Sequence, residues 1–188
     1  MNIAKFKFAI LRQKFEELVM VLFEMTKNSN LRFRFLDLAE GSVDRGIWYE
    51  KECALRYEVL RKPLGGDHIG KGSELFPFEF QSLHLIAFDD DSNSVTGCVL
   101  FHPETQTSGR LFQMAVDHVY QGRGIGTALV TTLLDRLVSE GFLECTLHAR
   151  EHAVTFYKLL GFVTFGEPFD EVNVPHRHMR IDLLNRNK

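Results

Sequence analysis

The sequence predicts an α/β (α+β) fold, in which a mixed, mostly antiparallel central sheet is flanked by helices and preceded by an extra N-terminal helix. Two patterns support this prediction. Apolar segments at 83–88 and 95–101 flank a short polar turn, which is typical of an antiparallel hairpin. The strand-like segment 110–116 runs through a glycine-rich turn into the amphipathic segment 124–140, which indicates a helical crossover. Because both kinds of connection occur, the sheet is expected to be mixed.

The predicted elements follow one another as helix, strand, helix, three strands, helix, strand, helix and two closing strands. Their approximate ranges in chain order are 3–27, 31–36, 44–61, 83–88, 95–101, 110–116, 124–140, 143–149, 151–160, 162–165 and 178–183. We expect two regions: an N-terminal helical extension over residues 1–30 and one domain over residues 31–188.

The first three elements are predicted from their apolar spacing and their ends. Apolar side chains recur at helical spacing within residues 3–27, and the polar run 28–30 ends that helix. Residues 31–36 alternate apolar and charged side chains, as expected of a strand with one solvated face. Asp44 is expected to cap a helix whose end is marked by Pro63.

The middle of the chain contains an irregular segment and the hairpin. Residues 64–82 are rich in glycine and contain Pro77, so no regular element is expected there. The acidic run 89–93 joins the two hairpin strands. It lacks the glycine and the distal glutamate of a calcium-binding loop, so we interpret it as a solvated turn.

The second half is predicted to add two helices and three strands. Within 124–140 the apolar positions form one stripe that can be buried, and Gly141 is a suitable residue to end that helix. Residues 143–149 favour a strand, and Gly161 ends a helix over residues 151–160.

Composition indicates an ordered globular protein. The chain has 188 residues, of which 45% are hydrophobic and 17 are Phe, enough for a sizeable core in one domain. Its net charge of −3 does not indicate a general nucleic-acid binder. Cys53, Cys98 and Cys145 are odd in number and widely spaced, which indicates free thiols in a reducing cytoplasm. The apolar run 18–23 is too short to span a membrane, and charged residues interrupt any signal-peptide core.

One glycine-rich segment matches a nucleotide-binding pattern but does not fit the corresponding structure. Residues 65–71 match G-x-x-x-x-G-K, yet Gly72 stands where a magnesium-binding Ser or Thr is required. No buried strand precedes the segment, and Pro77 interrupts the short stretch in which the following helix would have to form. We therefore expect a loop and not a phosphate site.

A second glycine-rich segment, residues 121–126, has the context of a phosphate site because it joins a predicted strand to the start of a predicted helix. The first amides of a helix have no intrahelical partner and lie at the positive end of its dipole, while glycine lets a ligand approach the backbone. Arg123 adds a cation that can pair with a phosphate. The spacing excludes a dinucleotide site, because Thr127 stands where its third glycine would be.

The pattern Gln-x-x-Gly-x-Gly in this segment, with residues 114–116 upstream, resembles the acetyl-CoA motif of the Gcn5-related N-acetyltransferase (GNAT) family. Residues 153–162 resemble the A-x-x-F-Y-x-x-L-G-F helix and strand of that family, and residues 57–64 resemble its first helix in some members. Residues 148–150 and 171–179 resemble a smaller subset of members.

The resemblance covers residues 31–184 and implies an acetyl-CoA site. Turn amides would hold the pyrophosphate, and the preceding strand would pair with the pantetheine arm. The implied coenzyme contacts are Met114, Ala115, Val116, Gln121, Gly122, Arg123, Gly124, Ile125, Gly126 and Thr127. One position departs from the family pattern: Arg150 stands where many members carry Asn, so a coenzyme contact of that Asn is not carried over.

The resemblance also implies Tyr157 as the acid that protonates the leaving thiolate; the alternative is a packed aromatic of a core helix. The amine needs a base, and the candidates by titration range or position are His84, Glu151, Glu171, His176 and His178. The sequence singles out none of them; we take Glu171 and His176 as the site candidates. His176 and His178 share a strand face but lack a third ligand, so no metal site is expected.

We therefore expect a cytoplasmic, acetyl-CoA-dependent N-acetyltransferase that acetylates a primary amine of a small molecule or peptide by direct attack. A non-catalytic acyl-CoA sensor and an interaction module of the same fold remain alternatives. No nucleic acid, membrane or metal partner is expected. The N-terminal helix would cover its own domain or pair with a second copy in a homodimer. Deleting residues 1–27 would then lower stability without abolishing acetyl-CoA binding.

Overall fold

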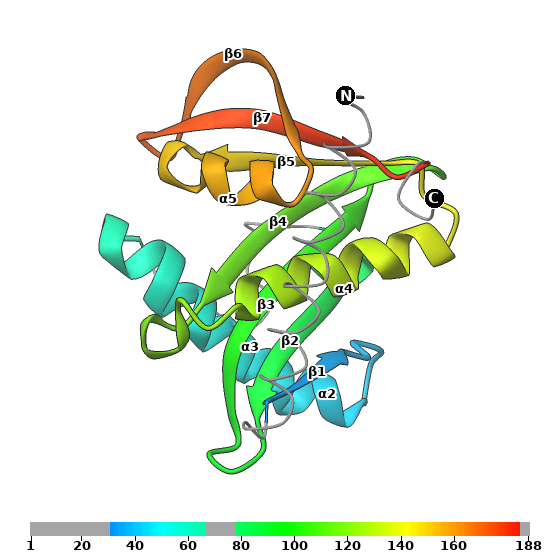
Figure 1. Cartoon of the computed structure of the whole chain (residues 1–188). Coiled ribbons are helices and arrows are strands. Elements are labelled where there is room, and N and C mark those ends of the chain that lie inside the picture. The colour runs from blue at the N-terminus through cyan, green and yellow to red at the C-terminus, as the bar shows by residue number, and fades with distance from the viewer. Residues whose placement is uncertain (1–30, 67–77, 185–188) are drawn as a thin grey trace, which may run out of the picture.

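The computed structural model describes residues 31–66 and 78–184 and shows one seven-stranded sheet with helices on both faces (Figure 1). The strand order across the sheet is β1-β2-β3-β4-β5-β7-β6. The strands are β1 (Leu31–Phe35), β2 (Leu83–Asp89), β3 (Ser94–Pro103), β4 (Ser108–Val116), β5 (Glu144–Arg150), β6 (Val163–Glu171) and β7 (Val174–Asp182). The α-helices are α2 (Val43–Gly46), α3 (Trp48–Arg56), α4 (Ile125–Ser139) and α5 (Val154–Leu159).

Neighbouring strands are antiparallel except for β4 and β5, which are parallel. The parallel pair follows from the connection, because α4 carries the chain back along the sheet between these two strands. The predicted mixed, mostly antiparallel sheet flanked by helices is confirmed. The predicted helix over 3–27 and a large part of the irregular segment 64–82 lie outside the described residues.

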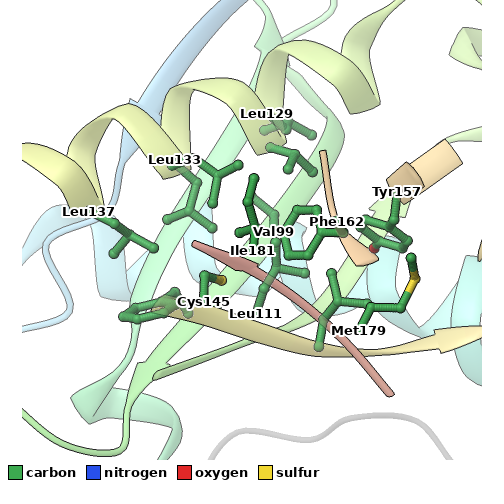
Figure 2. Packing of buried hydrophobic residues seen from close by; sticks show 14 of the residues in the cluster. Val99, Leu111, Leu129, Leu133, Leu137, Cys145, Tyr157, Phe162, Met179 and Ile181 are labelled. Atoms are coloured by element: carbon green, nitrogen blue, oxygen red, sulfur yellow. The ribbon is translucent and has the colours of Figure 1, made fainter. Parts of the chain in front are cut away.

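One face of the sheet packs against α4 and α5 and contains the larger core. Ile125, Leu129, Leu133 and Leu137 recur at helical spacing along α4 and are almost fully buried. Each such side chain contributes about 1.5–3 kcal/mol when it leaves water. The residues of this core labelled in Figure 2 are Val99, Leu111, Leu129, Leu133, Leu137, Cys145, Tyr157, Phe162, Met179 and Ile181.

The opposite face packs against α3 through a smaller apolar cluster and a buried polar network. Nδ1 of His84 lies 2.7 Å from Oε2 of Glu52, and Nε2 of His84 lies 2.9 Å from the backbone oxygen of Glu79. Arg56 is fully buried and pairs with the Glu79 carboxylate, which also accepts the Tyr49 hydroxyl at 3.0 Å. The buried charges therefore occur in pairs, which offsets part of their desolvation.

The predicted helix over 44–61 differs from the structure at its start. Ser42, not Asp44, is the N-cap of α2, because its hydroxyl accepts the amide of Arg45 at 3.2 Å. Asp44 lies in the first turn and pairs with Arg34 of β1 at 2.8 Å. The helix thus begins two residues earlier than predicted, and the Asp44 carboxylate pairs with a strand cation, a contact that local sequence does not show.

The same predicted helix also differs at its end, because α-helical geometry stops at Arg56 and not near residue 61. After α3 the chain forms the π-helical turn Tyr57–Arg61 and the 3₁₀ turn Lys62–Leu64, and Gly65 closes it with a φ of 69°. Pro63 therefore lies inside the last turn and does not follow the helix. It is tolerated there because the first residues of a helical turn need no backbone donor.

The two closing strands are longer than predicted. β6 and β7 each span nine residues, whereas the apolar pattern indicated only 162–165 and 178–183. β6 is an edge strand with mostly exposed side chains, so no regular apolar alternation marks it. The pairing with β7 shifts between Phe165 and Phe169, where Gly166 has a φ of 64°.

Two turns agree with the sequence prediction. Asp89 accepts the amides of Asp91 and Ser92 at 2.9 and 3.2 Å, which forms the solvated turn between β2 and β3. Gly141 follows α4 with a φ of 86°, and its amide donates to the carbonyl of Val138 at 3.1 Å. In the described ranges, no helix is both long and apolar enough to cross a bilayer.

Candidate active site

The parallel strands β4 and β5 separate part-way along their length. They are paired from Ser108↔Glu144 to Leu111↔Leu147, and beyond Leu111 the described part of β4 pairs with β3 alone. Figure 1 shows the two strands running apart from this point. We call this feature the β4–β5 fork. It leaves one backbone edge of β4 without a strand neighbour among the described residues.

A β-bulge lies at the same place in β4. The register between β3 and β4 shifts between Cys98 and Leu100. The β4 residues Gln113 and Met114 therefore lie opposite a single β3 residue, and Gln113 has a φ of 49°. Because a bulge bends its strand and increases its twist, it helps to take the end of β4 away from β5.

The end of β4 presents polar backbone groups to the fork. The amide of Asp117 donates to the Thr96 carbonyl at 2.9 Å, on the β3 side. Since the backbone groups of successive strand residues point to opposite edges, those of Val116 point away from β3. The Val116 carbonyl accepts a hydrogen bond there from the side chain of Gln121, at 3.0 Å.

The turn before α4 is held in a left-handed backbone conformation at two glycines. Gly122 has a φ of 73° and Gly124 a φ of 78°, a region that disfavours residues with a Cβ. A Cβ on Gly122 would meet nothing within 4 Å, so the turn is open at that point. Gly124 is the N-cap of α4 and offers no side chain to the helix. The amides of residues 125–127 therefore have no intrahelical acceptor, which is the arrangement that binds anions.

Gln121 fastens this turn to the end of β4. Its side-chain amide donates to the Val116 carbonyl and also lies 3.3 Å from Nδ1 of His118. His118–Tyr120 forms a 3₁₀ turn that Asp117 caps. The contact seen for Gln121 is thus with the protein, where it positions the glycine turn. A direct contact with the coenzyme stays a prediction.

Gly126 marks the point where α4, β4 and α5 meet. A Cβ at this position would lie 2.7 Å from Cε of Met114 and 3.4 Å from Cζ of Phe156. The glycine turn, the bulged end of β4 and the helix that carries Tyr157 are therefore neighbours in space, as the resemblance implied for three separate stretches of sequence.

Two of the predicted contact residues direct their side chains into the protein. Ala115 is buried in the cluster on the α3 face, and Ile125 is buried in the core under α4. Only their backbone groups are available to a ligand. Arg123, in contrast, is exposed, and its guanidinium carbon lies 5.2 Å from the ring centroid of Tyr120.

Tyr157 lies in the core next to this junction. It is 6% exposed and lies beside Phe162 in the core (Figure 2). It makes edge contacts with Phe156 and Phe162, at centroid distances of 5.0 and 5.6 Å. Burial raises the pKa of the phenol, and the nearby Cys145 adds a smaller effect in the same direction. The hydroxyl therefore stays protonated at neutral pH. This placement fits both expectations for the residue, proton donor and packed aromatic.

Glu171, at the end of β6, pairs with a histidine that sequence reasoning missed. Its Oε2 lies 2.9 Å from Nδ1 of His148 on β5, and the two side chains are 48% and 27% exposed. Alternation along the predicted strand 143–149 was sufficient to place His148 on the face opposite Cys145 and Leu147. It could not show which carboxylate the histidine would meet.

His176 and His178 lie on one face of β7, as predicted. Nδ1 of His176 lies 2.7 Å from the Val174 carbonyl and must carry the donated hydrogen, and the residue is 6% exposed. His178 stacks on Phe169 with ring centroids 4.1 Å apart. Burial lowers the pKa of His178, and the neighbouring His148 lowers it further. In the parts of the chain that the structure describes, no group of three His, Cys, Asp or Glu side chains could hold a metal ion.

The other two base candidates lie apart from this cluster. His84 is buried on β2, with both ring nitrogens engaged by Glu52 and Glu79, so it has no lone pair to offer an amine. Glu151 is exposed in the 3₁₀ turn Glu151–Ala153 that precedes α5.

Arg150 connects the two sides of the fork. Its Nη2 donates to the carbonyl of Leu60 in the π-helical turn after α3, at 2.9 Å. The long side chain thus reaches from β5 to the turn that follows α3, the helix that packs on β3 and β4. π-helical turns are uncommon and often lie at functional sites. Arg150, which stands where many family members carry Asn, thus contacts the protein itself at this position.

Comparison with known proteins agrees with this arrangement. The acetyltransferase (GNAT) domain family matches residues 77–183. An uncharacterized acetyltransferase of Streptococcus pyogenes is 31% identical over 93 residues, which cover 50% of this chain and 62% of the relative. The chain thus spans less than two thirds of the length of that relative.

Solved structures show the same fold at low identity. An aminoglycoside 6'-N-acetyltransferase complexed with coenzyme A superposes with a TM-score of 0.65 at 17% identity, over 82% of this chain and 98% of that one. A GNAT family acetyltransferase from Elizabethkingia anophelis with acetyl-CoA bound gives 0.57 at 13% identity, over 81% and 98%. Since the family match covers more than half of the sequence, the chain belongs to the GNAT acetyltransferase family.

Proposed function

We propose that the protein is an acetyl-CoA-dependent N-acetyltransferase that acts on a primary amine of a small molecule or peptide. The observation that carries this proposal is the β4–β5 fork next to the uncapped N-terminus of α4. The fork offers an extended ligand a strand edge, and the helix N-terminus offers its phosphates a set of amides. Two structural relatives hold coenzyme A or acetyl-CoA on the same fold.

The turn before α4 fits a pyrophosphate. Gly122 and Gly124 keep the backbone open to a ligand, and residues 125–127 supply amides at the positive end of the helix dipole. Arg123 is exposed beside them and adds a charge-assisted hydrogen bond, which is roughly twice as strong as a neutral one.

The end of β4 fits the acyl-bearing arm. Val116 directs backbone groups to the fork, and together with Met114 it would bond the pantetheine amides as an added strand does. A backbone amide near Val116 would hold the thioester oxygen as negative charge develops on it. Loss of such a donor lowers reaction rates by about 10²–10³-fold.

Direct attack forms one nitrogen–carbon bond and breaks the carbon–sulfur bond, and the departing thiolate needs a proton. Tyr157 would supply it. The raised pKa keeps the proton on the phenol but also weakens the phenol as an acid. We therefore expect its contribution at the low end of general acid catalysis, about 10²-fold.

The acceptor is not determined by the fold, because related folds carry many different specificities. One structural relative is an aminoglycoside 6'-N-acetyltransferase, which makes amines of small molecules a first class to assay. A release assay for the free thiol of coenzyme A, run over amines, polyamines and peptides, tests the proposal. Calorimetry with acetyl-CoA accompanies it.

We expect saturable binding of acetyl-CoA and thiol release with at least one class of amine. No binding of acetyl-CoA would contradict the proposal. Binding without turnover across the whole panel would favour the non-catalytic acyl-CoA sensor.

A further inference from the structure

The two faces of β5 have different surroundings. Cys145, Leu147 and Ala149 are buried in the core under α4 and α5. His148 alternates with them, so it lies on the opposite face of the sheet, the side on which α3 packs (Figure 1). Glu171 and His148 therefore meet on the face of the sheet that α4 and α5 do not cover.

His148 stands at the fork. Leu147 is the last residue of β5 that pairs with β4, opposite Leu111, and His148 is the next residue. Its side chain is 27% exposed, so a solvent-borne amine can reach it. The ring thus lies on the side of the sheet away from α4, whose N-terminus would hold the pyrophosphate.

Contacts from β7 and from β6, the strand beyond it, fix the ring of His148. Nδ1 lies 2.9 Å from Oε2 of Glu171 on β6, and edge contacts place the ring centroids of Phe169 and His178 at 4.9 and 4.8 Å. An ionised carboxylate only accepts hydrogen bonds, so Nδ1 carries the hydrogen and Nε2 keeps the lone pair. Because the carboxylate holds this tautomer, Nε2 is the ring nitrogen that can accept a proton.

We propose that His148 is the general base of the reaction and that Glu171 is the residue that positions it, an inference that rests on the proposed acetyltransferase function. Nε2 takes one proton from the acceptor ammonium, and the neutral nitrogen then forms the bond to the acyl carbon. The carbon–sulfur bond breaks with its electron pair on sulfur. The attacking nitrogen loses its second proton to solvent. Tyr157 gives its proton to the thiolate and regains one from solvent, and the imidazolium returns its proton to solvent, so that one proton is released in each turnover.

The other titratable groups on this face are less suited to the role. Glu171 and His178 are the groups that face His148 from β6 and β7. Among the described residues no carboxylate hydrogen-bonds to the ring of His178, and burial together with His148 lowers its pKa. His176 is 6% exposed, which restricts access to its ring. Glu171 therefore acts through the histidine in this scheme.

The decisive experiment compares the pH profiles of kcat/KM for the wild type, His148→Gln, Glu171→Gln and the control His152→Gln. His152 is an exposed histidine of the 3₁₀ turn before α5. At pH 7 we expect His148→Gln to lose about 10²-fold or more in kcat/KM, with unchanged affinity for acetyl-CoA in calorimetry. The loss shrinks as pH rises, because more of the acceptor is then already neutral.

Glu171→Gln tests the positioning role separately. Its side chain is 48% exposed, so the substitution is not expected to unfold the protein. Loss of the carboxylate disfavours the imidazolium, so the acidic limb of the profile should move to lower pH along with a smaller fall in kcat. A merely structural role would lower the rate without moving that limb. The double variant should be no slower than His148→Gln. Glu171 acts only through His148 in this scheme, so its loss has no further effect once the histidine is gone.

The possible outcomes separate the base assignment from the proposed function. Wild-type kcat/KM and an unshifted profile in folded His148→Gln would overturn the base assignment alone. If His148→Gln does not fold, an unshifted acidic limb in Glu171→Gln overturns it. A wild type that neither binds acetyl-CoA nor releases thiol with any amine would overturn the proposed function, and the base assignment with it.

Discussion

Tyr157 brings a phenol into the apolar junction of α4, β4 and α5. Its ring packs against Phe156 and Phe162, and burying an aromatic side chain of this size contributes about 1.5–3 kcal/mol. Removing the hydroxyl leaves these ring contacts in place. A substitution by phenylalanine therefore separates proton donation from packing.

We expect Tyr157→Phe to lower kcat by about 10²-fold, while the dissociation constant of acetyl-CoA changes by less than about twofold. Steady-state kinetics and calorimetry measure the two quantities. Tyr120→Phe is the matched control, because that hydroxyl donates to Asp89 at 3.2 Å and has no part in the proposed chemistry. Equal turnover in Tyr157→Phe and wild type would assign the residue to packing and leave water as the acid.

At the scale of elements, the candidate site is a junction of α4, β4 and α5. At Gly126 the helix α4 approaches Met114 of β4 and Phe156 of α5 closely. A Cβ there would lie 2.7 Å from the end of the Met114 side chain, which is flexible and can move. The helix can therefore accept a larger residue. The space between the first turn of α4, β4 and Phe156 would then be filled.

We expect Gly126→Val to weaken acetyl-CoA binding by at least about tenfold, because the branched side chain obstructs the approach to the first-turn amides while the core under α4 is unchanged. Calorimetry measures the affinity, and thermal unfolding measures the fold. Gly46→Ala is the control, since a Cβ at that helical position meets nothing within 4 Å. Unchanged affinity in folded Gly126→Val would contradict the phosphate assignment.

Arg150 joins elements on the two sides of the fork through its bond to the Leu60 carbonyl. A hydrogen bond from a charged donor contributes about 1.5–3 kcal/mol when buried, and less where solvent competes. We expect Arg150→Met to lower the free energy of unfolding by about 1 kcal/mol in urea titrations. Arg180→Met is the control, because its ion pair with Glu144 is exposed and 3.9 Å long. Equal stability of the two variants would show that the bond contributes nothing.

At the scale of the whole molecule, the two faces of the sheet are stabilised differently. The α4 face is apolar, whereas the α3 face holds the pairs His84–Glu52 and Arg56–Glu79. Nε and Nη1 of Arg56 and Oε1 of Glu52 have no hydrogen-bond partner among the described residues. Removing one member of such a buried pair typically costs about 3–5 kcal/mol, because a charge is left uncompensated.

The charge of His84 links this network to pH. Burial lowers the pKa of His84, but its pairing with Glu52 and its hydrogen bonds outweigh burial, so the pKa is raised above its ordinary value of 6.5. The folded state therefore holds the proton more tightly than the unfolded state. The stability that results is complete below about pH 6.5 and is lost as pH rises through the folded-state pKa.

We expect the free energy of unfolding, measured with urea, to fall as pH is raised above about 6.5. His84→Gln should remove most of this slope even if it is less stable at every pH. His178 has a lowered pKa and acts in the opposite sense, below about pH 6.5, so the two contributions fall in different ranges. An identical slope above pH 6.5 in wild type and His84→Gln would refute the link.

The sequence by itself determined the order of the described elements and predicted the glycine turn at the start of α4. Periodicity is a local property, so the stripe in 124–140 and the alternation in 31–36 were sufficient for a helix and a strand. The spacing of Gly122, Gly124 and Gly126 is likewise local, because a left-handed turn and unpaired first-turn amides need only neighbouring residues. Through its match to residues 77–183, the family was identifiable before any contact was known.

Only the tertiary structure decided which side chains meet. Glu171 reaches His148 from another strand, Arg150 reaches Leu60, and the buried charge of His84 is set by a helix and a turn. Each contact depends on strand order, register and which sheet face a helix covers. These are fixed by burying apolar area over the whole sheet, a free energy to which distant residues contribute together. No local pattern contains that information, and so the base proposed for this site emerged from the fold and not from its motifs.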